Sequence, residues 1–356
     1  MRPAARPRRY KIVLAFAAVY IIWGSTYLAI KVGIETIPPF FMAGIRFLIA
    51  GAILFLLIPR LREGVRPPTR QHWVSASVVG ALLLLGGNGA LVWSEQRVPS
   101  GLAALLLATI PIWMVLLDSL ASRDGQGTKL DARILGGLAI GIAGLALLVG
   151  PAKLWGSARV DLTGAGVLLF GSLSWSVGSL YSRRSKLPPS PFLAAAMEML
   201  AGGALLVVLG LLTGEVGQIR SRAISGASVL GLGYLIAFGS LLGFTAYIWL
   251  LSVTSTARVS TYAYVNPVVA VFLGWAFAGE ALSARTVMAT LAIVGAVALI
   301  LSHSPAGGPG AIAPDTEGLP TTEEERALAL GKEQESEVRS QEPEEFFRRC
   351  RDRDGL

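Results

Sequence analysis

The sequence between residues 12 and 303 is almost continuously hydrophobic, and it reads as two copies of one unit. Trp23 recurs as Trp175 and, further along the chain, Pro111 recurs as Pro267. Each copy has room for five membrane-spanning helices. A unit with an odd number of spans must enter the bilayer in the opposite direction when it is repeated. Inverted repeats of this kind are how many transporters build a central site that is reached from either side.

The composition indicates a membrane protein. The chain is 53% hydrophobic and 15% charged, with a mean hydropathy of +0.60. A bilayer-spanning helix needs about 20 apolar residues, and lipid leaves helices and closed barrels as the only spanning structures. No alternating barrel pattern appears, so we predict an all-α integral membrane protein with ten transmembrane helices in two inverted five-helix repeats. The predicted spans are 11–31, 38–59, 73–93, 98–120, 131–150, 161–182, 191–213, 226–250, 257–279 and 284–302.

The distribution of charged and apolar residues, together with the repeat, divides the chain into four segments. Residues 1–10 are a basic N-terminus, 11–150 and 151–302 are the two repeats, and 303–356 are a tail that holds thirteen of the 23 acidic residues. The tail begins SPAGGPG after His303 and then becomes rich in Glu, Arg and Ser. This composition is typical of disorder, so we expect a disordered, solvated C-terminal tail.

Basic residues predict the orientation. With the N-terminus inside, sixteen Lys and Arg residues fall in inner segments and seven in outer ones. This bias places both termini in the cytoplasm and makes the lipid bilayer the main environment of the chain. The first hydrophobic run continues to about Ile30 without a cleavage site, so we interpret it as a span and not a removable signal. The net charge of +8 lies mostly in short loops, which does not indicate binding to nucleic acid.

The sequence lacks the residues that a metal site, a catalytic site or a nucleotide-binding site would need. Cys350 is the single cysteine, and the two histidines, His72 and His303, stand at span ends. No metal site and no catalytic constellation is therefore expected. The loops are too short for a nucleotide-binding domain, and the sequence contains no phosphate-binding GxxxxGK[ST] motif. We predict no cofactor and no enzymatic activity.

Two charged residues occupy equivalent positions in the two copies, Arg46 in the second span and Glu198 in the seventh. Each lies about eight residues from a span end, roughly 12 Å deep at about 1.5 Å per residue. A charge at this depth costs several kcal/mol unless it is paired or hydrated. Two interpretations stay open: a substrate or proton-coupling site, and a buried ion pair that joins the copies.

Polar and aromatic residues inside the spans predict a central cavity. Pro111 and Pro267 are expected to kink their helices, because proline removes a helical hydrogen bond. Matching kinks in two repeats point to a central binding region, although a single proline kink is usually a matter of packing. Glu95 is expected to be a solvated loop carboxylate, with a functional role as the alternative. The candidate substrate-binding residues are Tyr27, Asn88, Trp175, Tyr247, Tyr262 and Asn266.

These residues lie within three stretches that resemble a known family. Residues 23–31 read WGSTYLAIK, residues 87–111 read GNGALVWSEQRVPSGLAALLLATIP, and residues 259–280 read VSTYAYVNPVVAVFLGWAFAGE. Residues 11–302 resemble the EamA family of the drug/metabolite transporter superfamily, close to its YedA-like exporters. The resemblance implies a multi-pass protein of a bacterial inner membrane that carries amino acids, metabolites or drugs, commonly outward.

The predicted function is therefore a secondary active transporter that exports a small amphipathic solute by alternating access. A passive channel or facilitator is the first alternative, and an integral-membrane enzyme is a second, weaker one. The expected partners are a small-molecule substrate and lipid. The sequence leaves open whether two copies form a homodimer.

Overall fold

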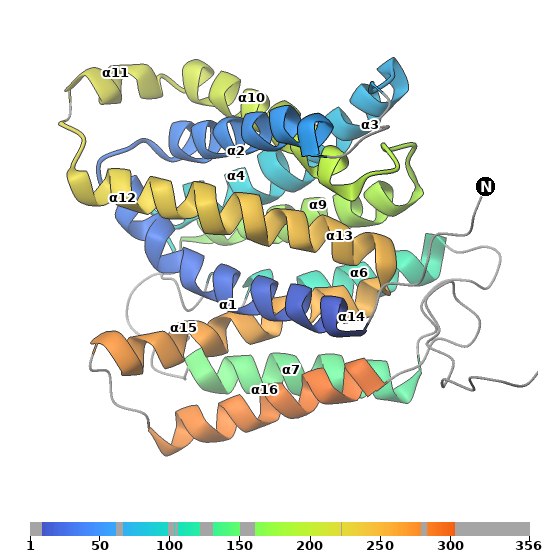
Figure 1. The fold of residues 1–356 in the computed structure, drawn as a ribbon. Helices are drawn as coiled ribbons and strands as arrows, with labels where there is room; N and C mark the ends of the chain where they lie inside the picture. Colours follow the sequence, from blue (N-terminus) through green and yellow to red (C-terminus); the bar gives the residue numbers. More distant parts are fainter. Residues whose placement is uncertain are drawn as a thin grey trace, which may run out of the picture. The chain divides into compact units, whose positions relative to one another are not determined.

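The computed structural model consists of helices joined by short connections throughout its described part (Figure 1). The N-terminal residues 1–8 and the predicted tail, 303–356, lie outside the described residues. The described residues are 9–61, 67–98, 103, 106–121, 131–149, 161–221, 223–278 and 283–302.

In this described part, seven helical segments are long and apolar enough to cross a membrane. Five are single α-helices, and each coincides with a predicted span. The other two are composite: an α-helical start passes into a π-helical segment and then into α-helix again. The single helices are α1 (Arg9–Ile34), α2 (Pro39–Leu61), α9 (Leu162–Arg184), α10 (Pro191–Leu212) and α16 (Ala284–Ser302). The composite ones are α3 (Arg70–Gly80) with η1 (Ala81–Asn88) and α4 (Gly89–Ser94), and α12 (Gly226–Tyr234) with η2 (Leu235–Phe244) and α13 (Thr245–Val253).

Shorter helices occupy the other three predicted spans. They are α6 (Ile110–Ala121), α7 (Ala132–Val149) and the pair α14 (Thr256–Ser260) and α15 (Tyr262–Ala278). The predicted span 257–279 is thus interrupted, because the helix breaks at Thr261. A further short helix, α11 (Glu215–Ser221), lies in a region that was expected to be a loop.

The two π-helical segments are a feature that hydropathy does not reveal. The repeat offset that relates Pro111 to Pro267 places η1 opposite residues 237–244, which lie within η2. A π-helix has i→i+5 hydrogen bonds and is therefore wider than an α-helix, and π-helical segments are frequent at functional sites. Their ends, Asn88 and Phe244, hold equivalent positions in the two copies and line one cavity.

Helices pack in pairs that are related by exchange of the two copies (Figure 1). The second helices, α2 and α10, lie side by side, and so do the fifth helices, α7 and α16. The first helix of each copy packs against the π-helical segment of the other, α1 against η2 and α9 against η1. Each copy therefore completes its core with elements of the other.

Glycines permit the closest of these contacts. On α2, a Cβ atom at Gly44 would lie 2.6 Å from the Val207 side chain, and one at Gly51 would lie 2.9 Å from the Ala196 carbonyl oxygen. On α10, a Cβ atom at Gly203 would lie 2.9 Å from the Leu48 backbone nitrogen. Small residues let helices approach closely where lipid supplies no hydrophobic driving force between them.

A distant carboxylate stabilises the start of α2. Both oxygens of Glu215, from α11, accept backbone hydrogen bonds, one from Phe40 at 3.1 Å and one from Phe41 at 2.9 Å. The first N–H groups of a helix have no partner within it, and a negative charge is favourable there. The helix α11 of the second copy, which was not predicted, thus caps the start of α2 in the first copy.

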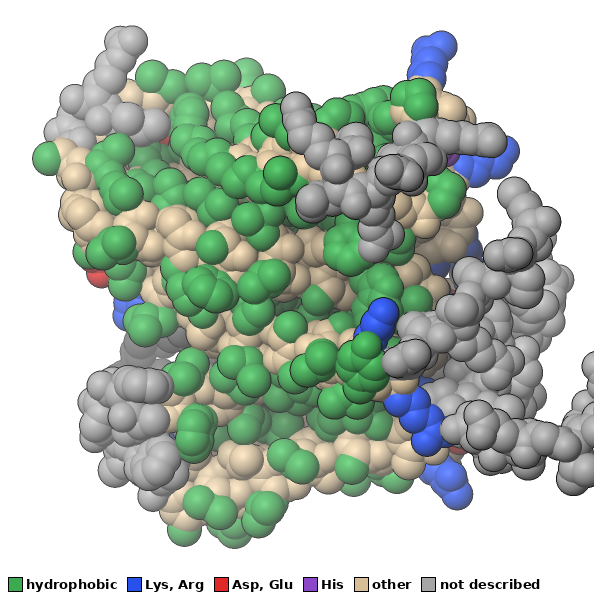
Figure 2. All heavy atoms as spheres, viewed as in Figure 1, with side chains coloured by type: hydrophobic (Ala, Val, Ile, Leu, Met, Phe, Trp, Pro, Cys, Tyr) green, Lys and Arg blue, Asp and Glu red, His purple; other side chains and the backbone are tan. Residues whose placement is uncertain are grey.

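The outer face of the helices is apolar. Figure 2 shows hydrophobic side chains over most of the visible face, with most of the visible Lys and Arg side chains at the side where α1 begins. Leu28, Leu230 and Leu291 are all more than 60% exposed. In water such a surface would be unstable, whereas lipid accommodates it without cost.

Candidate functional site

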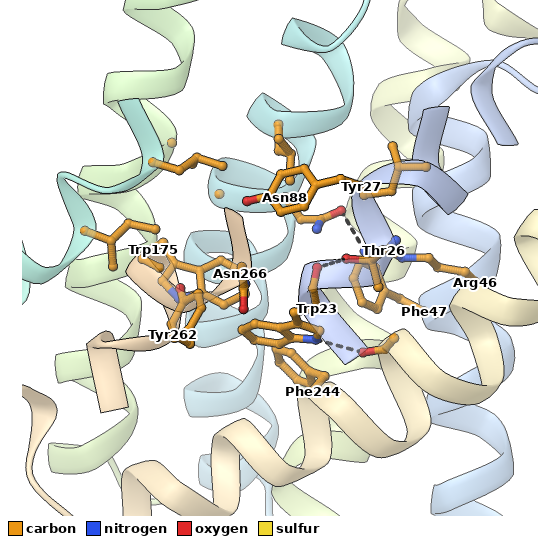
Figure 3. A pocket seen from close by; sticks show the side chains of 18 residues that line it. Trp23, Thr26, Tyr27, Arg46, Phe47, Asn88, Trp175, Phe244, Tyr262 and Asn266 are labelled. Atoms are coloured by element: carbon orange, nitrogen blue, oxygen red, sulfur yellow. Dashed lines mark hydrogen bonds between the residues drawn. The ribbon is translucent and has the colours of Figure 1, made fainter. Parts of the chain in front are cut away.

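A cavity lies between the helices of the two copies (Figure 3). It encloses about 750 Å³ of space that no atom occupies, part of it open to the surroundings, which limits any occupant to a small molecule. Five of the six predicted substrate-binding residues line it, the exception being Tyr247. The lining residues from the first copy are Trp23, Thr26, Tyr27, Ile30, Arg46, Phe47, Gly87, Asn88, Leu91, Leu107 and Ile110. Those from the second copy are Gly171, Trp175, Gly239, Phe244, Tyr262, Ala263 and Asn266.

Aromatic rings form one side of the cavity, around Trp23. The Trp23 ring meets Trp175 edge to face at 5.6 Å and Tyr262 edge to face at 5.0 Å between centroids. Its indole nitrogen donates a hydrogen bond to the Gly239 carbonyl oxygen at 3.1 Å, which fixes the ring. Edge-to-face contacts of this kind stabilise a rigid apolar wall. Trp23 marked the repeat in the sequence but was not among the predicted site residues.

Tyr247 stands behind this wall. Trp175 Nε1 donates to the Tyr247 hydroxyl at 2.8 Å, and that hydroxyl lies 2.6 Å from Ser179 Oγ. Ser179 in turn donates to the Trp175 carbonyl oxygen at 2.7 Å. These bonds hold the indole at its nitrogen and at its backbone. Tyr247 therefore positions Trp175 and does not itself line the cavity.

Arg46 and Asn88 form the polar side of the cavity. Arg46 Nη2 donates to Asn88 Oδ1 at 3.0 Å, and the guanidinium carbon lies 4.3 Å from the centre of the Phe47 ring. The residue is 5% exposed, and its Nε and Nη1 atoms are buried without a hydrogen-bond partner from the described residues. An amide from a π-helical segment thus orients a buried cation that keeps unused donors beside the cavity.

Of the two interpretations of Arg46 and Glu198, the buried ion pair is not supported by the structure, because no salt bridge joins them among the described residues. Salt bridges among the described residues join Arg97 to Asp161 and Arg184 to Asp118. The reason is helix rotation. On α2 the face that meets α10 contains Gly44, and Arg46 lies about 200° around the helix from it at about 100° per residue.

The same geometry turns Glu198 away. On α10 the contact face contains Ala196 and Leu200, and Glu198 lies between them in sequence, about 200° from each. Glu198 is fully buried, neither of its carboxyl oxygens has a hydrogen-bond partner of good geometry among the described residues, and Ser182 of α9 lies beside it. Equivalent positions in the two copies therefore place the two groups on opposite sides of the α2–α10 contact.

Asn266 closes the cavity next to the interruption between α14 and α15. In the orientation that satisfies both neighbouring acceptors, its amide nitrogen donates to the carbonyl oxygens of Tyr20 at 3.2 Å and Tyr262 at 3.1 Å. Pro267 follows it inside α15. The amide thus connects α1 to the helix of the second copy that begins at the break.

Pro111 does not bend a continuous helix as predicted. It stands in the first turn of α6, directly after a turn at residues 108–109. Proline is tolerated there because the first N–H groups of a helix have no intrahelical partner. In this position Pro111 starts a helix, whereas Pro267 lies within one.

Glu95 is not the solvated loop carboxylate that was expected. Its Oε2 atom is buried and has no hydrogen-bond partner within the described ranges, and its charge acts on Arg46 and Lys31. It follows Leu91 by four residues and Asn88 by seven, so all three share one helix face. That spacing was present in the sequence and could have assigned Glu95 to the cavity side of its helix.

The match to a family model covers nearly all of this architecture. The model of the EamA-like transporter family matches residues 10–150 and again residues 162–302. The chain belongs to this family. The two EamA segments contain the two copies described above, and both contribute walls to the cavity.

Relatives within the EamA family carry transporter names. The chain is 42% identical over 288 residues to the uncharacterized inner membrane transporter YedA of Escherichia coli (strain K12), a match that covers 80% of this chain and 89% of that protein. It is 27% identical to the uncharacterized transporter YoaV of Bacillus subtilis (strain 168), with 80% and 94% covered. These matches and the apolar helices indicate a multi-pass protein of the inner membrane.

A solved crystal structure shares the EamA fold seen here. It superposes with a TM-score of 0.66 at 22% sequence identity and covers 82% of this chain and 96% of the other. At this identity the likeness shows the fold alone.

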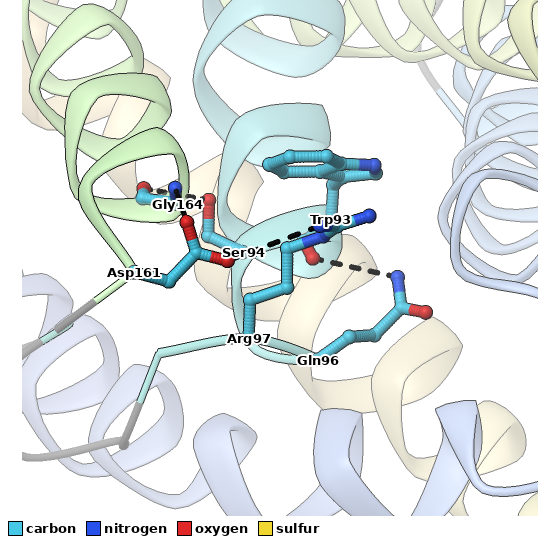
Figure 4. A network of polar contacts seen from close by, with 6 residues as sticks. All are labelled: Trp93, Ser94, Gln96, Arg97, Asp161 and Gly164. Atoms are coloured by element: carbon cyan, nitrogen blue, oxygen red, sulfur yellow. Dashed lines mark hydrogen bonds and ion pairs between the residues drawn. The ribbon is translucent and has the colours of Figure 1, made fainter. Parts of the chain in front are cut away.

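Polar contacts join the first EamA segment to the second at one end of the helices (Figure 4). Ser94 Oγ donates to the Gly164 carbonyl oxygen at 3.2 Å, and Arg97 Nη1 lies 3.8 Å from Asp161 Oδ2. The Arg97 guanidinium also lies 4.3 Å from the centre of the Trp93 ring. This network fixes α4 to the start of α9 next to Glu95.

Proposed function

We propose that the protein is a secondary active transporter that carries a small amphipathic solute through the cavity by alternating access. One observation carries the proposal: a small-molecule cavity with an aromatic wall and a polar wall, built jointly by two repeats. Apolar parts of a solute pack on rings, while polar groups meet fixed amides and hydroxyls. Tyr27, Asn88, Trp175, Tyr262 and Asn266 are the proposed contact residues, with Tyr247 positioning Trp175.

We further propose ten membrane-spanning helices in two inverted repeats. The reciprocal pairing of α2 with α10 and of α7 with α16 supports two copies related by a two-fold axis. An odd number of spans in each copy makes that axis lie in the membrane plane. The basic bias of the sequence supports a cytoplasmic location for both termini.

The two π-helical segments supply moving parts in this proposal. Both η1 and η2 end at the cavity and pack against the first helix of the other copy. Alternating access requires one repeat to rock against the other around a fixed site. Segments with irregular hydrogen bonding at that contact can change their curvature at lower cost than regular α-helix.

We propose that transport is directed outward, as the family resemblance implies, and that Glu198 carries the coupled proton. Glu198 is fully buried in α10, a helix long and apolar enough to cross a membrane, and it has no cationic partner within 4 Å among the described residues. A carboxyl group in that setting is a functional-site hypothesis by default. Its neighbour Ser182 lies on α9, one turn from the Ser179 that contacts Tyr247.

A metabolite screen tests the transport proposal. Cells that overproduce the wild-type protein are compared with cells that produce Ala263→Trp, which fills the cavity, and Leu230→Trp, which adds the same ring on the exposed outer face. The proposal predicts that one or more solutes shift from the intracellular to the extracellular pool with the wild type and Leu230→Trp only. Equal pools in all three strains at equal protein levels would contradict it.

Counterflow in proteoliposomes then separates a carrier from a channel. A carrier whose site opens to one side at a time exchanges labelled solute faster when unlabelled solute is present on the opposite side. A continuously open channel gives no such acceleration, so its absence would favour the facilitator alternative.

A further inference from the structure

Arg46 is a buried cation with unused hydrogen-bond donors beside the cavity. The residue is 5% exposed, and its Nη2 atom donates a hydrogen bond to Asn88. The Nε and Nη1 atoms are buried and have no hydrogen-bond partner in the described part of the chain. Figure 3 shows the guanidinium next to Thr26 and Phe47 at one side of the cavity.

A guanidinium in this position lacks the counter-charge that a membrane interior requires. The salt bridges of the described residues do not include it, and the acidic group whose charge acts on it, Glu95, does not reach within 4 Å. A buried cation without a close anion is unfavourable, and so are buried donors without acceptors. A bound anion with several acceptor oxygens would supply both the missing negative charge and the missing hydrogen-bond acceptors.

We propose that Arg46 binds a carboxylate group of the transported solute, and that Asn88 positions the guanidinium for it. This inference rests on the proposed transport function and names the substrate class. A carboxylate accepts two or more hydrogen bonds from a guanidinium, and such charge-assisted bonds are the strong ones. The solute is then a small organic anion whose apolar part packs against Trp23, Trp175 and Tyr262.

The positions of the other charges support an anion and not a cation at this point. The Asn88 side-chain oxygen already accepts a hydrogen bond from Arg46. The Arg46 side of the cavity therefore offers hydrogen-bond donors to a solute, the Nε and Nη1 atoms of Arg46. Among the residues that line the cavity, Arg46 is the single charged side chain. The solute's negative group is therefore expected at the Arg46 side and its apolar group at the aromatic side.

Calorimetric titration of the purified full-length protein in lipid nanodiscs tests this assignment. The probes are two matched pairs that differ only in the acidic group: phenylacetate with phenylacetamide, and 4-methylpentanoate with 4-methylpentanamide. Phenyl phosphate and inorganic phosphate are titrated in parallel, to separate a carboxylate site from a general phosphate site. We expect each carboxylate to bind about tenfold or more tighter than its amide, as a hydrogen bond to a charged group implies.

Two variants identify the residue. Arg46→Gln should abolish the preference for the carboxylate, and Arg46→Lys should keep a reduced preference, because it retains the charge but not the planar fork. The exposed Arg285→Gln is the matched control and should behave as the wild type. Should Arg46→Gln fail to fold, the acid–amide comparison in the wild type and in Arg46→Lys still decides.

The outcomes are distinct. Equal binding of acid and amide to the wild type, or an unchanged preference in Arg46→Gln, would overturn the anion site while leaving an amphipathic cavity and the transport function in place. Binding of inorganic phosphate in preference to every carboxylate would also overturn it. No binding by any probe would contradict both the anion site and the proposal that this cavity holds the solute.

Discussion

Trp175 of α9 and Tyr247 of α13 are joined by a 2.8 Å hydrogen bond from the indole nitrogen to the phenol oxygen, directly behind the cavity wall. Tyr247 is completely buried, and its hydroxyl also contacts Ser179. The ring that a solute would meet is therefore held by a residue that the solute does not touch.

Tyr247→Phe tests this arrangement. The change removes the acceptor of a buried indole N–H, which we expect to destabilise the protein by about 1–3 kcal/mol. The readout is the thermal unfolding midpoint in nanodiscs. Tyr10→Phe, at a position 53% exposed, is the matched control and should leave the midpoint unchanged. A midpoint for Tyr247→Phe equal to that of the control would mean that the bond is unimportant.

Close contact between α3 and α10 predicts a second effect. A Cβ atom at Gly202 would lie 2.7 Å from the Gly80 carbonyl oxygen and 2.7 Å from Leu84 Cβ, so Gly202→Ala should push the two helices apart. Gly233→Ala is the matched control, because a Cβ atom there meets nothing within 4 Å. We expect Gly202→Ala to lower the unfolding midpoint. Gly233→Ala should preserve or raise it, because alanine in a helix stabilises the folded state by up to about 1 kcal/mol relative to glycine. Equal midpoints would show that the helix contact is looser than described.

The helices and the repeat follow from the sequence, whereas the rotation of each helix does not. Hydropathy places α2 and α10 correctly, and the repeat pairs Arg46 with Glu198 by position. Which face each helix presents depends on Gly44 and Gly51 packing against the other helix, and that is a property of both copies together. For this reason the sequence left open whether Arg46 and Glu198 form an ion pair, and the described residues contain no such pair.

Part of the polar and aromatic cavity lining could be predicted from the sequence. Polar or aromatic residues in apolar spans, such as Asn88 and Asn266, are costly in lipid and so indicate a protein-lined space. Trp23 was not predicted to line the cavity, although it lies in the middle of the predicted span 11–31, as far from the interfaces as its repeat partner Trp175. The π-helical segments η1 and η2 could not be predicted, because their apolar sequences fit regular α-helix equally well.

Glu198→Gln tests the proton-carrier proposal. Glutamine resembles the protonated acid in shape and cannot ionise. Because Glu198 has no cationic partner within 4 Å among the residues that the structure describes, the variant is expected to fold and insert normally and to lose only the stimulation of transport by a proton gradient. Proton-driven transport at the wild-type rate would rule Glu198 out as the carrier.

Glu95 predicts a pH dependence of anion binding. Burial raises the pKa of Glu95 to about 8, while the charges of Arg46 and Lys31 act in the opposite direction. Below this value the neutral acid leaves the charge of Arg46 available, and above it the carboxylate competes with the solute's anion. We expect phenylacetate to bind about fivefold more weakly at pH 9.5 than at pH 6.5. In Glu95→Gln the affinity should be independent of pH over this range, and a wild-type profile in that variant would contradict the assignment.

The apparent KM of the solute identified by the metabolite screen, measured in proteoliposomes, tests the central claim most directly. Asn88→Ala frees Arg46 from its positioning bond, and Asn266→Ala removes the amide at the opposite wall, so both should raise KM by about tenfold at wild-type protein levels. Leu230→Ala, on the exposed outer face, is the control and should leave KM unchanged. A KM equal to that of the wild type in both asparagine variants would contradict the placement of the transport site in this cavity.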